Sequence, residues 1–163
     1  YHAAIERVPE SRILHNNKVV DLLAIGSEMV RGEILYRQAK YDEAYAALHR
    51  AIAFEDNLPY DEPWGWMQPV RHALGALLLE QGHTDEAEMV FREDLGLGGQ
   101  LARATVHPDN VWALKGLHDC LKARGETVEI VQVRQRLDLA QARSDGPIAA
   151  SCFCAQAATR TVE

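Results

Sequence analysis

Cysteines and long apolar runs are scarce in this chain, and basic residues are in the minority. Three cysteines, two of them separated by a single residue, do not make the paired framework of a small secreted protein. We therefore expect a reducing compartment, with the cytoplasm as the default. No apolar run approaches the roughly 18 residues that a membrane-spanning helix needs. The 17 basic and 24 acidic residues give a net charge of −7, which argues against the basic surface typical of nucleic-acid binding.

Sequence signatures of catalysis are missing as well. The segment Gly96-Leu-Gly-Gly99 lacks the Lys-Ser/Thr pair of a phosphate-binding loop and does not follow a strand. The chain contains no Gly-x-Ser-x-Gly motif, which would mark the nucleophile of a hydrolase. We expect a protein that is not an enzyme and needs no cofactor.

What the sequence does contain is repetition. The segment Ala39-Lys-Tyr-Asp-Glu-Ala44 returns as Gly82-His-Thr-Asp-Glu-Ala87 and, more faintly, as Gly125-Glu-Thr-Val-Glu-Ile130, each time 43 residues later. A fixed period of this length indicates a repeat architecture, in which each unit buries its apolar face against its neighbours.

Each repeat combines two stretches of helical periodicity around a short break. In the middle repeat, a glycine just past a helix end and acidic residues at the next helix start fit the chemistry of helix ends. The apolar positions before and after the break are Val70, Leu74, Leu77 and Leu78, then Ala87, Val90 and Phe91. The first repeat has Met29, Val30, Ile34 and Leu35, then Tyr41, Ala44, Ala47, Leu48 and Ala51; the third has Val111, Leu114, Leu117 and Leu121, then Val128, Val131 and Leu137.

These residues resemble the tetratricopeptide repeat (TPR) family, which pairs two antiparallel helices with small residues at their crossing. The matches are Gly32, Ala44, Leu48 and Ala51, then Leu74, Gly75, Leu78, Gly82, Ala87 and Phe91, then Leu114, Leu117, Leu121 and Gly125. The third repeat departs at His118, Ile130 and Arg134. The family period is about 34 residues, so the extra length must lie between the hairpins, in 54–67 and 95–110. The resemblance implies an all-α solenoid.

The expected organisation is three TPR-like hairpins over 16–143, namely 16–56, 67–97 and 109–143. Residues 1–15 are interpreted as the remnant of a preceding repeat, which would make the chain the C-terminal part of a longer array. Gln132, Arg134 and Arg136 give the last helix the polar surface of a terminal capping repeat. Residues 144–163 lack periodicity and are expected to form an irregular tail.

The loop between the first two hairpins is the densest group of unusual residues. It holds Tyr60, Asp61, Glu62, Trp64 and Trp66, followed by Arg71 and His72. Aromatic residues beside arginine are typical of binding hot spots, and loops on rigid scaffolds often carry function. The structural alternative is that the tryptophans pin the loop to the hairpins while Asp61 or Glu62 pairs with Arg71. His72 could form an acid–base pair with these neighbours, although a histidine that only donates hydrogen bonds is the commoner case.

By analogy with the family, first-helix residues at fixed offsets from the crossing residue face the concave groove. This resemblance implies a partner-binding stripe of Met29, Glu33 and Tyr36, then His72, Ala76 and Leu79, then Lys115, Asp119 and Lys122. Lys115 and Lys122 without an accompanying Asn do not fit a clamp for a C-terminal carboxylate. An extended or helical peptide is the expected ligand.

Cys152-Phe-Cys154 is the most suggestive chemical motif. Two thiolates at this spacing could chelate a soft metal or close a disulfide. A zinc site needs further ligands, and the histidines are scattered through the sequence. We favour two cysteines in a loosely held tail.

The sequence thus predicts a scaffold that binds a protein or peptide. Two alternatives stay open: a metal-binding or enzymatic subunit that uses Cys152, Cys154 and His72, and a purely structural capping segment whose groove is filled by its own tail.

Overall fold

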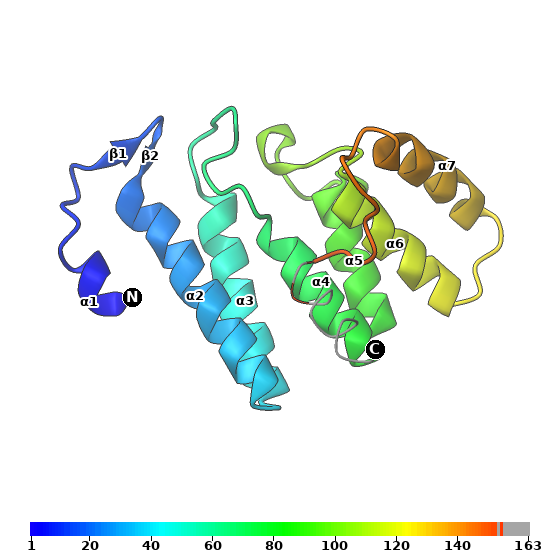
Figure 1. Cartoon of the computed structure of the whole chain (residues 1–163), viewed down its shortest axis with the longest axis horizontal. Helices are drawn as coiled ribbons and strands as arrows, with labels where there is room; N and C mark the ends of the chain where they lie inside the picture. Colours follow the sequence, from blue (N-terminus) through cyan, green and yellow to red (C-terminus); the bar gives the residue numbers. More distant parts are fainter. Residues whose placement is uncertain (153, 155–163) are drawn as a thin grey trace. The chain divides into compact units, whose positions relative to one another are not determined.

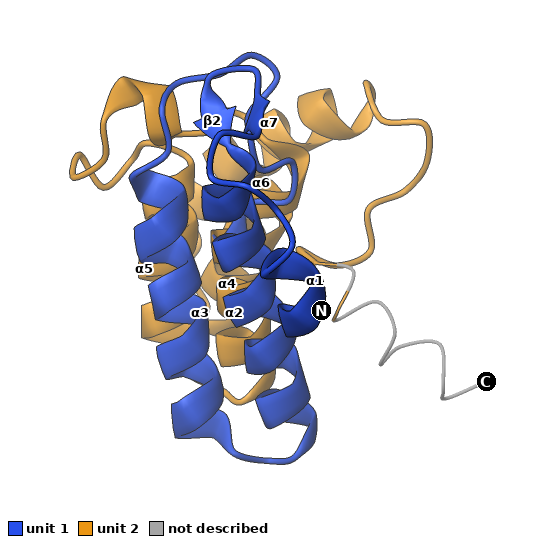
Figure 2. Cartoon of the chain, turned by 90° about the vertical axis from the view of Figure 1, so that its left-hand side faces the viewer, with its two compact units in different colours: residues 1–70 blue, residues 71–163 orange. Residues whose placement is uncertain are grey.

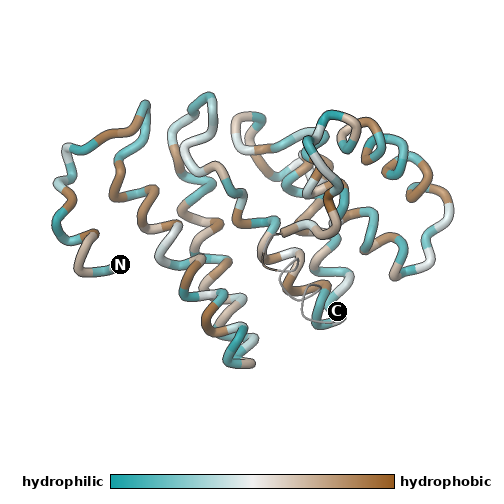
Figure 3. The backbone as a smooth tube through the Cα atoms, in the orientation of Figure 1, coloured by the Kyte–Doolittle hydropathy of each residue, from teal (hydrophilic) through white to brown (hydrophobic). Residues whose placement is uncertain are grey.

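The computed structural model describes residues 1–152 and 154, and over this range the chain is mainly helical (Figure 1). Seven α-helices and one short β-hairpin make up the described part, so the all-α prediction is confirmed at the level of fold class. The chain divides into two compact units, residues 1–70 and 71–163 (Figure 2). Apolar and polar residues are interspersed along the helices (Figure 3). None of the described helices has both the length and the apolar character needed to cross a bilayer.

Unit 1 is built on a pair of long helices. Helix α1 (His2–Ile5) is followed by a hairpin of β1 (Ile13–Leu14) and β2 (Asn17–Lys18), then by α2 (Val19–Arg37) and α3 (Tyr41–Asp56). The loop 57–69 ends the unit. The strands are antiparallel, with Ile13 opposite Lys18 and Leu14 opposite Asn17. The sequence does not predict this hairpin, because strands of two residues leave no periodicity to detect.

Helices α2 and α3 pack closely because a glycine faces a leucine. A Cβ added at Gly32 would lie 2.8 Å from Leu48 Cγ, so the missing side chain makes room for Leu48. Ile25, Ala44 and Leu48 are fully buried around this crossing. Both helices lie within the predicted hairpin range 16–56.

Unit 2 contains two further helix pairs. They are α4 (Val70–Glu80, whose first residue ends unit 1) with α5 (Thr84–Asp94), and α6 (Val111–Ala123) with α7 (Glu129–Gln141); the 3₁₀ turn η1 (Arg103–Thr105) lies in the loop between the pairs. Phe91 of α5 is fully buried between two glycines. A Cβ at Gly75 of α4 would lie 2.5 Å from Phe91 Cζ, and one at Gly116 of α6 would lie 2.2 Å from the same atom.

The first helix of every pair ends in the same way. Ala39, Gly82 and Gly125 all have positive φ, at 58°, 81° and 69°. The next backbone N–H donates to the carbonyl five residues back: Lys40 to Leu35, His83 to Leu78 and Glu126 to Leu121, at 2.9–3.0 Å. These are Schellman ends. They recur every 43 residues, so the sequence period is also a period of backbone geometry.

The last helix departs from the expected pattern. By the period, α7 would begin at 127, but it begins at Glu129, where the Glu126 carboxylate accepts bonds from the N–H groups of Val128 and Ile130. The buried residues of α7 are Val133 and Leu137, four apart on one face.

Two expectations for this helix are therefore corrected. Val128 and Val131 are 72% and 55% exposed and do not belong to the buried stripe. The polar surface expected of a cap is present at Gln132 and Arg134, which are exposed, but it is not continuous, because Leu139 is 66% exposed.

Candidate functional site

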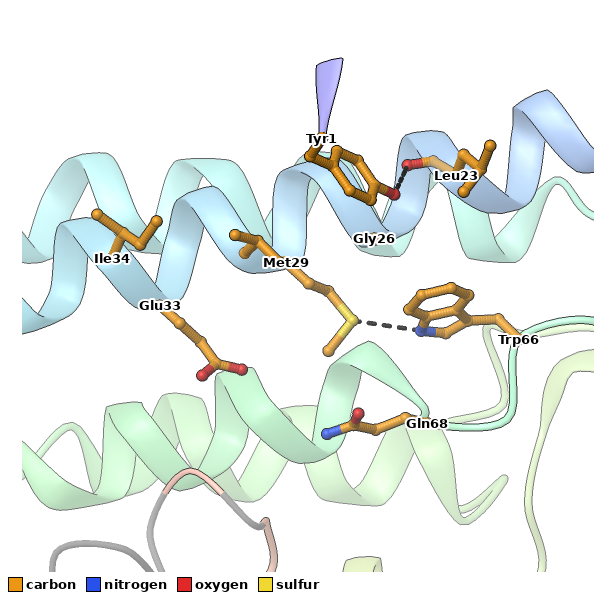
Figure 4. A pocket seen from close by; sticks show the side chains of 9 residues that line it. Tyr1, Leu23, Gly26, Met29, Glu33, Ile34, Trp66 and Gln68 are labelled. Carbon is orange, nitrogen blue, oxygen red and sulfur yellow. Dashed lines mark hydrogen bonds between the residues drawn. The ribbon is translucent and has the colours of Figure 1, made fainter. Parts of the chain in front are cut away.

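A cavity of about 480 Å³ opens beside α2 in unit 1 (Figure 4). Its lining is mainly apolar and comes from α2, the loop before α4 and the first residue of the chain. The lining residues are Tyr1, Leu23, Gly26, Met29, Val30, Glu33, Ile34, Trp66 and Gln68. The volume falls within the ~300–1,000 Å³ typical of ligand sites.

The residues from α2 share one face of the helix. Gly26, Val30 and Glu33 follow one another at spacings of three and four, which brings them into line. A Cβ at Gly26 would lie 2.7 Å from Tyr1 Oη and 3.0 Å from Trp66 Cη2. The absence of a side chain at Gly26 therefore allows two aromatic rings to approach the helix backbone and form walls of the cavity.

The loop that carries Trp66 is held in place by the β-hairpin. The buried Asp61 carboxylate accepts hydrogen bonds from Asn17 Nδ2 at 3.1 Å and from the Asn16 backbone N–H at 3.3 Å. Asn17, fully buried, also donates to the Pro59 carbonyl at 3.2 Å. The loop is thus anchored by side chains more than 40 residues earlier in the sequence, and Asp61 has a structural role.

Two of the polar groups in the cavity are already engaged. Trp66 Nε1 donates to Met29 Sδ at 3.2 Å, and Tyr1 Oη donates to the Leu23 carbonyl at 2.7 Å (Figure 4). Glu33 is half-buried at one end of the lining. Burial raises the pKa of its carboxyl, and the positive charge of Arg37 one turn later lowers it by less.

The structure brings three of the predicted partner-binding residues together in this cavity: Met29, Glu33 and Trp66. Tyr36 is 4% exposed and packs edge-on against Tyr41. Arg71 and His72 are each 5% exposed. Tyr36, Arg71, His72 and Asp61 are buried and do not line this cavity, so they are removed from the predicted contact surface.

The remaining predicted residues lie outside this cavity. Lys115 and Asp119 form an ion pair one helical turn apart on α6, so neither charge is isolated. The other positions are exposed or half-buried: Tyr60, Glu62, Trp64, Leu79 and Lys122.

His72 belongs to a buried cluster in unit 2. Its Nε2 lies 2.9 Å from Asp94 Oδ2, and His107 Nδ1 lies 2.8 Å from Asp94 Oδ1. An ionised carboxylate only accepts hydrogen bonds, so both rings donate to it. Burial would raise the Asp94 pKa, but the bonds from His107 and His72 outweigh it and hold the pKa below its ordinary value. The predicted partners of His72, Glu62 and Arg71, are replaced by a carboxylate 22 residues away.

This cluster joins helix α4, the end of α5 and the loop before α6. Arg71, next to His72 on α4, pairs with Glu93 at 3.5 Å. All three members of the cluster are less than 8% exposed. The arrangement fixes the loop 95–110 to the helices, and we assign it a structural role.

A second cavity, of about 540 Å³, lies along α5 in unit 2. Three of its charged side chains are paired: Arg92 donates to Glu88 at 2.8 Å and to both Glu129 oxygens at 2.8 and 2.6 Å, and Arg124 also bonds Glu88. Paired charges of this kind connect helices and leave fewer hydrogen-bonding groups for a ligand.

Cys152 and Cys154 are joined as a disulfide and are 3% and 8% exposed. Both cysteines are therefore buried, in contrast to the predicted loosely held tail; Phe153 and residues 155–163 lie outside the described part. Sulfurs bonded to each other do not ligate a metal. Among the described residues, no group of three His, Cys, Asp or Glu side chains is arranged to hold a metal ion.

The lining residues that were not predicted to bind a partner are Tyr1, Leu23, Gly26, Val30, Ile34 and Gln68. Tyr1 and Gln68 lie far from α2 in the sequence, and no local pattern links them to it. Gly26 lies six residues before Gly32 and outside the family motif, so a glycine on the apolar face of a predicted helix was the one available signal.

Comparisons of the chain with family models, with curated proteins and with solved structures found no match.

Proposed function

We propose that this chain is a protein-interaction module that binds a peptide segment in the α2 cavity. The observation that carries the proposal is the cavity itself: an apolar recess beside a long helix, with a tryptophan wall held by a hydrogen-bonded loop. Pre-formed apolar recesses with few polar groups are the usual form of ligand sites, and tryptophan is enriched at binding hot spots.

The exposed side chains beside the cavity support binding of a segment longer than a small molecule. Val30 and Ile34 are 50% and 52% exposed, one turn apart on the same face of α2. An amphipathic helix or extended peptide anchored in the cavity would cover them.

We also propose that the three helix pairs belong to a TPR-like solenoid. The support is the helix end that recurs every 43 residues and the glycines at the first-helix crossing positions, Gly32 and Gly75. Small-angle X-ray scattering tests this proposal. A solenoid gives a radius of gyration clearly above the ~15 Å of a globular chain of this length, and a value at or below it would contradict the proposal.

The binding proposal is tested by selecting peptides from a displayed library against the whole chain. Dissociation constants of the selected peptides are then measured for the wild type and for Val30→Ser with Ile34→Ser. We expect weakening of at least about tenfold, because apolar contact area is lost. Met89→Ser with Leu139→Ser is the matched control, since these residues are 58% and 66% exposed in unit 2. Selected peptides that bind the first variant as tightly as the wild type would rule out the α2 cavity as the binding site.

A further inference from the structure

We infer that the peptide anchored in the α2 cavity carries a cationic side chain, lysine or arginine, next to an apolar residue, and that Glu33 recognises the cation. This inference rests on the proposed function and names the chemistry of the ligand. The apolar neighbour would contact Met29, Val30 and Trp66.

The charged side chain of the lining is a carboxylate. Among the nine residues that line the cavity, Glu33 has the one charged side chain. Glu33 and Met29 extend from the same side of α2 (Figure 4). An anionic ligand group would meet this carboxylate across an apolar space, whereas a cationic group would pair with it.

The carboxylate is also incompletely compensated. Its pKa is raised by burial, which means that its surroundings solvate the charge less well than water does. Arg37 acts on it through space but does not offset burial. A ligand ammonium or guanidinium that donates hydrogen bonds to Glu33 would supply the missing solvation.

Of the other polar side chains in the lining, Trp66 and Tyr1 already donate hydrogen bonds and Gln68 is uncharged. The Trp66 indole N–H is bonded to Met29, and the Tyr1 hydroxyl is bonded to the Leu23 carbonyl. The two rings themselves favour cations, because aromatic faces carry negative potential. Charge and ring chemistry therefore select the same class of ligand group.

The test uses four probe peptides, acetyl-Leu-Xaa-Leu-amide with Xaa as lysine, arginine, norleucine or glutamate. Binding to the full chain is followed by the NMR signal of the Trp66 indole N–H, assigned from its loss in Trp66→Phe. We expect the lysine and arginine peptides to bind at least about tenfold more tightly than the norleucine peptide, and the glutamate peptide most weakly. Norleucine keeps the apolar stem of lysine and removes its charge, so it isolates the contribution of the cation.

Glu33→Gln provides the second arm, because it keeps the shape of the side chain and removes its charge. We expect this variant to bind lysine and norleucine peptides equally, with the norleucine affinity unchanged. Glu43→Gln, an exposed carboxylate at the start of α3, makes the same change in net charge away from the cavity and should keep the preference.

The outcomes separate this inference from the function on which it rests. Equal binding of lysine and norleucine peptides by the wild type, or a lysine preference that survives in Glu33→Gln, overturns the cationic ligand while leaving peptide binding in place. If none of the four peptides shifts the Trp66 signal, and library peptides bind the Val30→Ser, Ile34→Ser variant as tightly as the wild type, peptide binding at this site is overturned together with the inference.

Discussion

Replacing Gly116 by alanine should destabilise unit 2, because the added methyl group collides with Phe91. The new Cβ would lie 2.2, 2.4 and 2.5 Å from Phe91 Cζ, Cε1 and Cε2. The ring cannot retreat freely, because its other side lies against the backbone of Gly75, where an added Cβ would be 2.5 Å from Phe91 Cζ. Overpacking of this kind costs about 1–3 kcal/mol. Alanine stabilises a helix by about 1 kcal/mol relative to glycine, so the free energy of unfolding should fall by up to about 2 kcal/mol.

The decisive measurement repeats the substitution in a Phe91→Leu background. Leucine lacks Cζ, Cε1 and Cε2, the three atoms that the new methyl group would meet. Phe91→Leu is destabilising by itself because it leaves a cavity. In that background, however, Gly116→Ala should be neutral or stabilising by up to about 1 kcal/mol, from helix propensity alone. The stability change caused by Gly116→Ala is thus expected to become neutral or to reverse its sign in this background.

Urea unfolding followed by circular dichroism gives the four free energies of the double-mutant cycle. Gly146→Ala is the control, because a Cβ at this position would meet no atom within 4 Å and its φ is ordinary; it should change stability by less than about 0.5 kcal/mol. If Gly116→Ala costs the same in both backgrounds, or stabilises the wild type by the full propensity term, the steric reasoning is refuted.

Three further predictions concern other buried groups. Because the Asp94 pKa is lowered in the folded state, its contribution to stability is fully present above the unfolded pKa of about 3.8 and is lost as the pH falls through the folded value. Asp94→Asn should therefore lower the free energy of unfolding by about 1.5–3 kcal/mol at pH 7 and make the urea midpoint depend less on pH in the acid range. A variant as stable as the wild type at pH 7 would contradict this. Asp61→Ala should increase amide hydrogen exchange across 57–69 by removing the bond from Asn17, whereas Glu62→Ala, exposed on the same loop, should not; equal exchange in both variants would remove the anchoring role. Burial raises the pKa of the Cys120 thiol to about 12, so iodoacetamide should alkylate it at least about tenfold faster in urea than in the native protein, and comparable rates, read by mass spectrometry, would show that the thiol is accessible.

The fold could be predicted to the extent that its signals are local. Helix periodicity and the breaks at Gly82 and Gly125 identified the helices, since a glycine past a helix end leaves a mark in the sequence. Ala39 has the same backbone conformation but is not a glycine, so only the repeat period indicated a helix end there. The role of Gly116 was missed because the family motif aligns His118 with the crossing position, two residues further on.

The candidate site could be predicted only in part, because most of its interactions join distant residues. Met29 and Glu33 followed from helix offsets, and Trp66 from the unusual composition of its loop. The partner of His72 could not be found, because Asp94 lies at the end of another helix. Buried polar pairs of this kind are selected by three-dimensional proximity, which periodicity does not encode.

The way in which α7 is attached has a consequence for solution conditions. This helix buries two apolar side chains, and the bidentate bond between Arg92 and Glu129 is one of its charged attachments, beside the bond from Arg136 to Asp109. The hydrogen bond to Arg92 is the main cause that lowers the Glu129 pKa. Acid that protonates Glu129 therefore weakens this ion pair, and concentrated salt weakens it by screening. Buffer composition therefore acts directly on the attachment of α7, through the ionic strength that screens its ion pairs and through the pH that protonates Glu129.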